Sequence, residues 1–451
     1  MATESGESAN HAPAKQNWTT LIDQMVAGNW RNPETGELAT VPYKSIIFEE
    51  TLDGREAELV ESMDFGASFT IVCDEATHEA IGGRIAKAIT KLGSVRTIVL
   101  NHPHADLASA EHLRSQLSGA EGVIAVGSGT INDLCKYATF QDNRPYCVFG
   151  TAGSMNGYTS TTASMTLASG LKVSLPAHAP RGFFVDLSVS AQAPSYLNAA
   201  GFGDCLARSV AQVDWWMSHR LLGTRYMQTP FLIQEKDETI LNGMSNLLPS
   251  GDITSIAYLY RVLTLCGLGV SFTGVSNHGS MGEHQISHYI DCFAGDRHPG
   301  TLHGQQVGVA SLSMARLQQA MIARDTPPIL HPTLINTADM VRRMGPQIAA
   351  QCEVEWRDKA LDEAGADALN TRLTSLWPVL RQELSAFIIP VGEMESLLKS
   401  AGGPTTAKEL NAPTDLYREA ILHAREIRNR FSFLDLAADA GELENFVSGE
   451  F

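Results

Sequence analysis

A chain of 451 residues is longer than one typical hydrophobic core, so its length predicts two to three domains. Its net charge of -17, from 33 basic against 50 acidic residues, argues against a nucleic acid or an anionic membrane as the main partner. Seven scattered cysteines, never spaced as Cys-x-x-Cys, indicate neither a disulfide framework nor a thiolate zinc site and favour a reducing, cytoplasmic compartment.

The beginning of the chain predicts a tail followed by an α/β domain. Residues 1–16 are polar and lack the apolar centre of a signal peptide, and no later run approaches the roughly 18 apolar residues of a membrane span. Short apolar runs then alternate with helical patterns over 76–92 and 108–117. The alternation predicts a doubly wound, Rossmann-like domain over residues 17–192, with strands at 68–73, 95–100, 122–126, 145–149 and 182–185.

The run from Val123 to Val126 stops at Gly127-Ser128-Gly129, and helical spacing resumes after it. The amides of Gly129, Thr130 and Ile131 would then open a helix N-terminus, which is a ready site for a phosphate. A tight strand-to-helix turn without a ligand explains a lone Gly-x-Gly equally well.

Asp74 follows an expected strand directly, at the end where ligands bind in such sheets. Its carboxylate would suit the hydroxyls of a ribose. An N-cap for the helix that begins at Glu75 is the competing interpretation.

From about residue 195 the pattern changes to long helical stretches. No run of alternating β-branched residues interrupts them. We therefore expect a predominantly helical domain over residues 193–451, with helices at 200–222, 232–248, 253–269 and 417–435.

The helical half contains a constellation typical of a metal site. His284 and His288 share one helix face, His303 follows, and Asp204 comes after two glycines at an expected helix start. One carboxylate and two imidazoles suit zinc, iron or nickel, and three protein ligands leave a position for substrate. Chance pairing among fourteen histidines, and an N-capping role for Asp204, are the competing explanations.

Several motifs, in order between about residues 40 and 440, carry a family resemblance. The chain resembles the sn-glycerol-1-phosphate dehydrogenase family, relatives of glycerol dehydrogenase within the iron-containing alcohol dehydrogenase and dehydroquinate synthase-like superfamily. The matching segments are 127–137, 151–160, 199–207, 213–215, 283–288, 303–309 and 424–435.

The resemblance implies a Rossmann-like N-terminal domain, an all-α C-terminal domain, NAD(P) in the cleft between them and one divalent metal. It implies Asp204, His284 and His303 as ligands, with His288 nearby as a proton relay. Asp74 would favour NADH, because its charge repels a 2′-phosphate. The positions matched to the cofactor are Gly127, Ser128, Gly129, Thr130 and Asp133 at the pyrophosphate, and Thr151 and Ser154 beside the nicotinamide.

Two positions depart from the family pattern. Asn156 stands where we expect an aspartate that reaches the substrate, and Asn277 stands where we expect an arginine. Lys172 and Arg208 remain as phosphate partners, although an exposed lysine on a sheet edge is the plainer interpretation of Lys172.

The leading functional expectation is a metal-dependent NAD(P)H oxidoreductase that interconverts dihydroxyacetone phosphate and sn-glycerol 1-phosphate, or a related phosphorylated ketone and alcohol. A dehydroquinate synthase-like cyclase, a polyol dehydrogenase acting on a non-phosphorylated substrate, and a relative that only binds nucleotide are the alternatives. Relatives suggest at least a homodimer.

Overall fold

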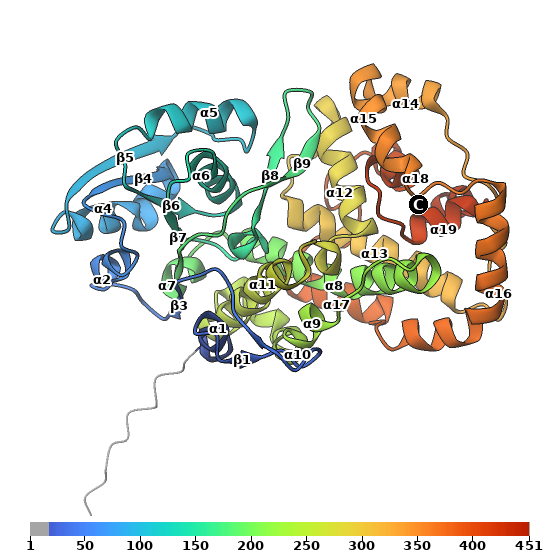
Figure 1. Ribbon diagram of the computed structural model, residues 1–451, viewed down its shortest axis with the longest axis horizontal. Coiled ribbons are helices and arrows are strands. Elements are labelled where there is room, and N and C mark those ends of the chain that lie inside the picture. The colour runs from blue at the N-terminus through green and yellow to red at the C-terminus, as the bar shows by residue number, and fades with distance from the viewer. Residues whose placement is uncertain (1–17, 451) are drawn as a thin grey trace, which may run out of the picture.

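The computed structural model describes residues 18–450, so the expected tail over residues 1–16 lies outside the described residues. In its N-terminal part, six parallel strands form one sheet in the order β3-β10-β7-β6-β4-β5 (Figure 1). The strands are β3 (Ser45–Glu49), β4 (Ser68–Asp74), β5 (Ser94–Leu100), β6 (Gly122–Gly127), β7 (Tyr146–Gly150) and β10 (Gly182–Asp186).

Alternate residues of the central strands face opposite sides of this sheet. In β6, Ile124 and Val126 belong to the core under the helices α2 and α4, whereas Val123 and Ala125 belong to the core under α5 and α6. Burial on both faces explains the uninterrupted apolar runs. The covering helices are α2 (Glu56–Glu61), α3 (Glu75–Thr77), α4 (Gly83–Ile89), α5 (Leu107–Gln116), α6 (Gly129–Gln141) and α7 (Leu187–Ala191).

The sheet confirms the five expected strands, but β3 was not expected. Its residues are alternately buried and half-buried at the edge of the sheet, and its short mixed sequence carries no strong apolar signal. The expected helix over 76–92 was wrong in continuity, because a π-helical turn, His78–Gly82, separates α3 from α4.

A hairpin leaves the sheet region and reaches the helical part. Its strands, β8 (Thr162–Thr166) and β9 (Lys172–Pro176), pair antiparallel and lie beside α12 (Gly282–Phe293) (Figure 1). Lys172 makes the contact: its backbone amide lies 3.1 Å from Cys292 Sγ and its ammonium 2.6 Å from Asp291 Oδ2.

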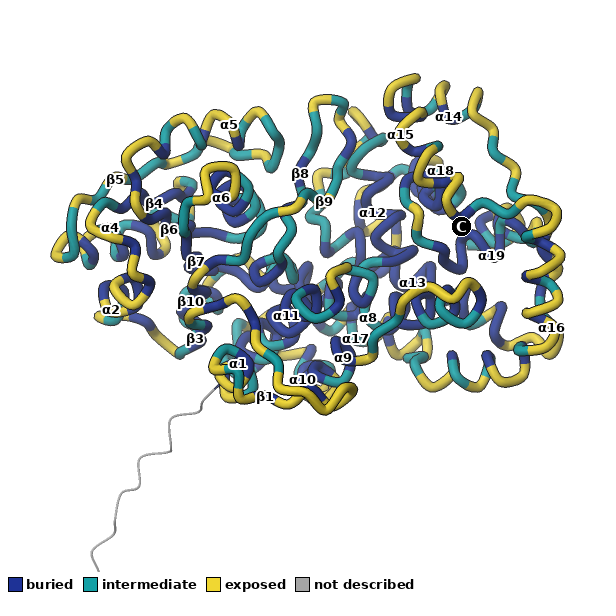
Figure 2. Tube along the Cα trace, viewed as in Figure 1, coloured by how far each residue is buried: buried dark blue, intermediate teal, exposed yellow. Residues whose placement is uncertain are grey.

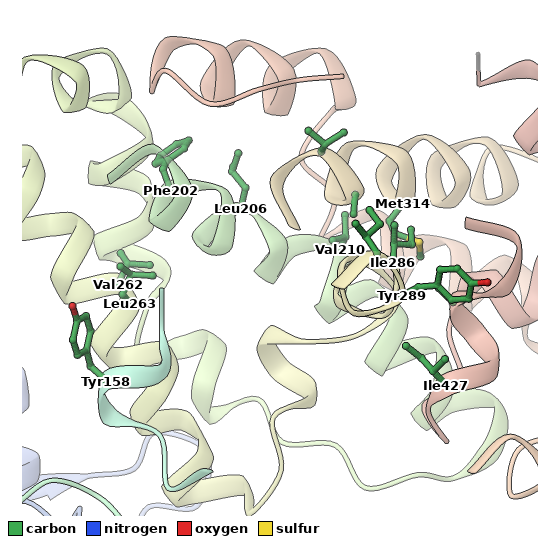
Figure 3. Packing of buried hydrophobic residues seen from close by; sticks show 14 of the residues in the cluster. Tyr158, Phe202, Leu206, Val210, Val262, Leu263, Ile286, Tyr289, Met314 and Ile427 are labelled. Carbon is green, nitrogen blue, oxygen red and sulfur yellow. The ribbon is translucent and has the colours of Figure 1, made fainter. Parts of the chain in front are cut away.

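The remainder of the chain is helical, as expected. Its central helices, α8, α11, α12 and α13, are buried along most of their length (Figure 2), and apolar side chains such as Phe202, Val262, Ile286 and Met314 pack between them (Figure 3). The helices other than α12 are α8 (Ser195–Leu222), α9 (Thr229–Leu232), α10 (Glu235–Gly243), α11 (Ile253–Thr273), α13 (His303–Ile322), α14 (Thr337–Met344), α15 (Pro346–Arg357), α16 (Glu363–Ser385), α17 (Val391–Ser400), α18 (Thr414–His423), α19 (Phe433–Asp439) and α20 (Leu443–Gly449).

Two expected helices were wrong in extent. The stretch 232–248 is divided between α9, α10 and a 3-10 turn that contains Pro249. The stretch 417–435 is not one helix. A 3-10 turn ends at Ile427, and a new helix begins after Ser432, whose side chain accepts a hydrogen bond from the amide of Leu434.

Glycines let α8 and α13 pack backbone to backbone. A Cβ on Gly203 would lie 2.3 Å from the carbonyl oxygen of Gly304, and one on Gly304 would lie 2.1 Å from that of Ala200. Asp204 lies inside α8 and not at a helix start. The expectation drawn from its two preceding glycines was therefore wrong. These glycines permit close packing and bring Asp204 beside the first residue of α13, His303.

The N-terminal segment packs on the helical part. It contains α1 (Thr20–Val26) and a short ribbon of β1 (Trp30–Arg31) and β2 (Leu38–Ala39). Trp18 contacts Tyr258 with ring centroids 5.7 Å apart, and Trp30 contacts Phe272 at 5.4 Å, so both rings lie against α11.

Within the described residues, α11 is the helix long and apolar enough to cross a membrane, although sequence inspection had found no such run. In its most apolar window, 78% of the residues are buried inside the protein. Its composition therefore matches its place as a central core helix.

Candidate active site

One cavity of about 540 Å³ receives most of the side chains expected in the site. The N-terminus of α6, the hairpin, α12 and the start of α13 all line it. The expected residues among its lining are Ser128, Gly129, Thr130, Asp133, Ser154, Asn156, Lys172, Asp204, His284, His288 and His303.

Three of these side chains, from three different helices, converge on one point. Ligand atoms of Asp204 (α8), His284 (α12) and His303 (α13) all lie within 4.8 Å of one another. The Nε2 atom of His284 is 3.3 Å from Asp204 Oδ1, and the two imidazole rings are 5.0 Å apart. The tertiary structure thus unites residues that are far apart in the sequence.

Both imidazoles are held so that Nε2 faces this point. His284 Nδ1 donates to Glu283 Oε1 at 2.8 Å, because a carboxylate only accepts. His303 Nδ1 lies 2.9 Å from Ser287 Oγ, whose own proton is given to Gln306 Oε1, so His303 is the donor in that pair.

The cluster fits a divalent metal ion. Two imidazoles and a carboxylate converge, and the buried Oδ1 of Asp204 has no well-formed hydrogen bond, only the contact with His284 Nε2 at 3.3 Å. An unsatisfied buried carboxylate oxygen is costly unless a cation or a donor meets it.

Neighbouring groups shift the protonation of the cluster. Burial acts to raise the pKa of Asp204, but His284 holds it below its ordinary value. Burial acts to lower the pKa of His284, yet Asp204 and Glu283 raise it to about 9. Burial, with the charges of His284 and Lys172, lowers the pKa of His303 to about 4. A metal ion would therefore displace a proton mainly from His284.

His288 lies beside the cluster, with its ring 5.4 Å from that of His303 and 6.3 Å from that of His284. Its buried Nδ1 has no hydrogen-bond partner. Burial, Arg428 and His303 keep its pKa well below the ordinary value, so its imidazole is neutral.

The glycine loop places the N-terminus of α6 in the same cavity. Ser128 makes no side-chain cap, which leaves the amides of the first turn facing the cavity. Neither Gly127 nor Gly129 has a positive φ, so no left-handed backbone requires glycine at either position. Crowding is the reason: a Cβ would lie 2.7 Å from Ile131 at Gly127 and 3.3 Å from Met155 at Gly129.

Asp133 and Lys136 anchor α6 to the segment that follows β7. Lys136 is fully buried and donates to the carbonyls of Gly157 at 2.6 Å and Thr162 at 3.1 Å. Burial raises the pKa of Asp133 to about 6 and lowers that of Lys136 to about 8. These contacts hold the segment from 151 to 162 against the glycine loop, as does the bond from the Thr151 amide to the Gly127 carbonyl at 3.3 Å.

Asn156 touches the cluster through its backbone. Its amide donates to Asp204 Oδ2 at 2.9 Å, and its side-chain nitrogen lies 3.5 Å from Cys266 Sγ. The side chain lines the cavity beside the cluster, where the family pattern predicts an aspartate.

Lys172 is the one lysine or arginine lining this cavity among residues 18–450. It shares this lining with Asp204, His284 and His303, and its charge helps to lower the pKa of His288 and of His303. Asp291 neutralises it at 2.6 Å, so the side chain is not the free, exposed lysine of the plainer interpretation.

The other expected residues lie outside the lining. Arg208 faces a second cavity, where it pairs with Glu238 and covers the ring of Phe231 at 5.6 Å. Asp74 caps α3, accepting from the Thr77 amide at 2.8 Å, as its competing interpretation predicted. The site cavity is not lined by Gly127, Thr151 or Asn277.

Sequence inspection did not assign four residues that support the site. These residues are Lys136, Glu283, Ser287 and Asp291. Glu283 adjoins His284 on α12, a spacing that was available in the sequence, whereas the other three residues make contacts between different elements, which leave no local signal.

Comparison with known proteins gives the class. Residues 47–194 match the family model described as iron-containing alcohol dehydrogenase. A glycerol dehydrogenase structure from Schizosaccharomyces pombe superposes with a TM-score of 0.59 at 16% identity, covering 90% of each chain. The fold is thus that of the iron-containing alcohol dehydrogenases, with a Rossmann-like sheet followed by a helical region.

Curated relatives narrow the class to a family. An NAD(P)+ glycerol-1-phosphate dehydrogenase from Methanoculleus marisnigri is 31% identical over 255 residues, which are 56% of this chain and 69% of that protein. One from Bacillus velezensis is 28% identical over 377 residues, 81% of this chain and 84% of that protein. The chain belongs to the glycerol-1-phosphate dehydrogenase family, and it is an oxidoreductase.

Proposed function

We propose that the protein uses NAD(P)H and one divalent metal ion to reduce a small phosphorylated ketone reversibly. The leading pair is dihydroxyacetone phosphate and sn-glycerol 1-phosphate, since the curated relatives are named for glycerol 1-phosphate and oxidation of its secondary alcohol gives that ketone. The observation that carries the proposal is the Asp204–His284–His303 cluster in the same cavity as the uncapped N-terminus of α6.

In this proposal the sheet of the expected 17–192 domain holds the cofactor and the helices of the expected 193–451 domain hold the metal and substrate, with the N-terminal segment from Trp18 to Ala39 packed on the helical part. The first-turn amides of α6 hold the cofactor pyrophosphate, since they are unpaired donors at the positive end of a helix dipole. Thr151 and Ser154 flank the nicotinamide. Asp74, at the end of β4, disfavours a 2′-phosphate and so favours NADH.

Asp204, His284 and His303 hold the metal through Oδ1 and the two Nε2 atoms. When bound, a zinc, nickel or iron ion stabilises the negative charge that develops on the substrate oxygen during hydride transfer. Glu283 and Ser287 keep the imidazoles in the required tautomer.

His288 moves the proton in this scheme. A neutral imidazole can donate from one nitrogen while it accepts at the other, and His288 is neutral with an unpartnered Nδ1. Lys172 contacts the substrate phosphate, because it is the one lysine or arginine lining the cavity within residues 18–450.

A polyol dehydrogenase acting on a non-phosphorylated substrate is the second candidate. The observation that favours it is the pairing of Lys172 with Asp291, which leaves little free positive charge for a dianion. A cyclase of the dehydroquinate synthase kind fits less well, because it is expected to need a glutamate ligand and more cations.

The net charge of -17 disfavours a nucleic acid or an anionic membrane as partner. We further propose a cytoplasmic location and a homodimer or larger homo-oligomer.

The test is oxidation of NADH and NADPH by metal-reconstituted protein with dihydroxyacetone phosphate, dihydroxyacetone and a phosphonate ketone. We expect the highest kcat/KM with dihydroxyacetone phosphate. Preference for dihydroxyacetone would favour the polyol enzyme. Absence of net cofactor oxidation with every ketone would overturn the oxidoreductase proposal.

A further inference from the structure

Glu283 is a fully buried carboxylate immediately before the metal-site histidine of α12. Its Oε1 accepts two hydrogen bonds at 2.8 Å, one from the backbone amide of Met281 and one from His284 Nδ1. Its Oε2 is buried and has no partner. A carboxylate in such a place costs stability unless something else requires its charge.

We propose that Glu283 is the positioning residue of the metal site: it fixes the ring and tautomer of His284 and strengthens Nε2 as a ligand. The inference rests on the proposed metal function of His284. A carboxylate that accepts from one ring nitrogen leaves the lone pair on the other and increases its basicity.

Glu283 does not line the cavity, and therefore it acts through His284 and not on substrate. Its exposed fraction is 0%, which excludes contact with a ligand in the cavity. A role as the proton donor or acceptor of the reaction is accordingly ruled out by position.

The surroundings hold this carboxylate in one place. The amide of Gly282 donates to Asp214 Oδ2 at 3.1 Å, and Asp214 also accepts from Gln318 and from the amide of Phe433 at 3.0 Å each. Asp214 thereby joins the start of α12 to α13 and α19. A Cβ on Gly282 would lie 2.9 Å from Asp214 Oδ2, so the approach requires glycine.

A cation also binds the turn that precedes Glu283. Arg430 donates to the carbonyl of Ser280 and to Ser276 Oγ at 2.8 Å. The turn that leads into Glu283 is therefore held from both sides before any metal binds, which is the arrangement that a precise ligand orientation requires.

The Nδ1 atoms of the two proposed histidine ligands donate to different kinds of acceptor, and this difference supplies an internal control. His284 donates to a carboxylate, whereas His303 donates to the neutral hydroxyl of Ser287. Removing the negative charge behind His284 should weaken the metal more than removing the hydroxyl behind His303.

The variants are Glu283→Gln, Glu283→Ala and the control Ser287→Ala. Gln keeps the shape and one acceptor but removes the charge. Each metal-free protein is loaded with Co²⁺, and its affinity is measured by competition with a chelator, its visible spectrum is recorded, and circular dichroism checks the fold.

We expect Glu283→Gln to lower Co²⁺ affinity by about 10- to 100-fold with an altered visible spectrum, and Ser287→Ala to lower it less. Wild-type affinity and spectrum in Glu283→Gln would overturn the inference, as would a larger loss in Ser287→Ala. Should Glu283→Ala fail to fold, the Gln variant still decides.

The assay separates this inference from the proposed reaction. A wild-type protein that binds Co²⁺ but oxidises no NAD(P)H with any ketone would remove the reaction and leave the role of Glu283 standing. A wild-type protein that binds no Co²⁺, Zn²⁺ or Ni²⁺ would overturn both.

Discussion

In the proposed function Asp204, His284 and His303 hold one metal ion together, although three helices carry them. Replacing any one by alanine removes a third of the protein ligands, so we expect loss of metal after dialysis and loss of turnover. The fold should remain, because the helix cores and not this cavity wall stabilise it. Circular dichroism and the melting temperature measure whether it does. His303→Ala with full metal content and a near-normal rate would contradict the assignment.

His288 stands beside these residues without joining the cluster. We expect His288→Ala to keep the metal and to lower kcat by about 100- to 10,000-fold, since a positioned proton relay contributes on that order. Metal analysis together with steady-state kinetics measures both effects. Loss of metal in this variant would make His288 a ligand and correct the proposal.

A substitution at Asn156 tests which ketone the pocket accepts. An aspartate there would put a second carboxylate into the cavity that Asp204 lines and would remove the side-chain nitrogen that lies 3.5 Å from Cys266 Sγ, so the added negative charge would repel an anionic substrate. We expect Asn156→Asp to give no gain in kcat/KM with dihydroxyacetone phosphate. A gain of about tenfold or more would show that the pocket is adapted to a different ketone.

At the scale of elements, the first turn of α6 is the predicted cofactor contact. A valine at position 129 would press on Met155, 3.3 Å from the new Cβ, and cover the helix N-terminus. We expect Gly129→Val to raise the KM for NAD(P)H at least tenfold with the metal still bound. Gly243→Val is the control, because Gly243 ends α10 with no atom within 4 Å of a Cβ. Unchanged NADH binding in calorimetry would show that the loop is only a turn.

At the scale of the whole molecule, Asp214 makes stability depend on pH. Burial and the charge of Glu283 raise its pKa from 3.8 to about 8. The folded protein thus keeps a proton that the unfolded chain releases, so this stabilisation is complete below about pH 4 and is lost as the pH rises to about 8. We expect the melting temperature of Asp214→Asn to fall less over that range than that of the wild type. Parallel profiles for the two proteins would contradict the shifted pKa.

Parts of this architecture were predictable from local patterns. The buried strands were, because apolar runs such as Val123 to Val126 carry their own signal. The edge strand β3 was not, because its alternating burial depends on its neighbours, whereas the break at Ser432 carried a local signal, the capping box with Asp435, that was overlooked. The residues of the site were found through spaced motifs, but the hydrogen bonds of Glu283 and Ser287 needed coordinates.

The sequence by itself determined the order of a parallel α/β region and a helical region, and it carried the His284, His288 and His303 pattern, because periodicity and residue type act locally. Only the tertiary structure decided which side chains meet. In that structure Asp204 is buried within α8 against α13, Arg208 lines another cavity, and Lys172 pairs with Asp291. Glycine-mediated packing between α8 and α13 set the first of these contacts, and packing between distant segments leaves no periodic trace in either one.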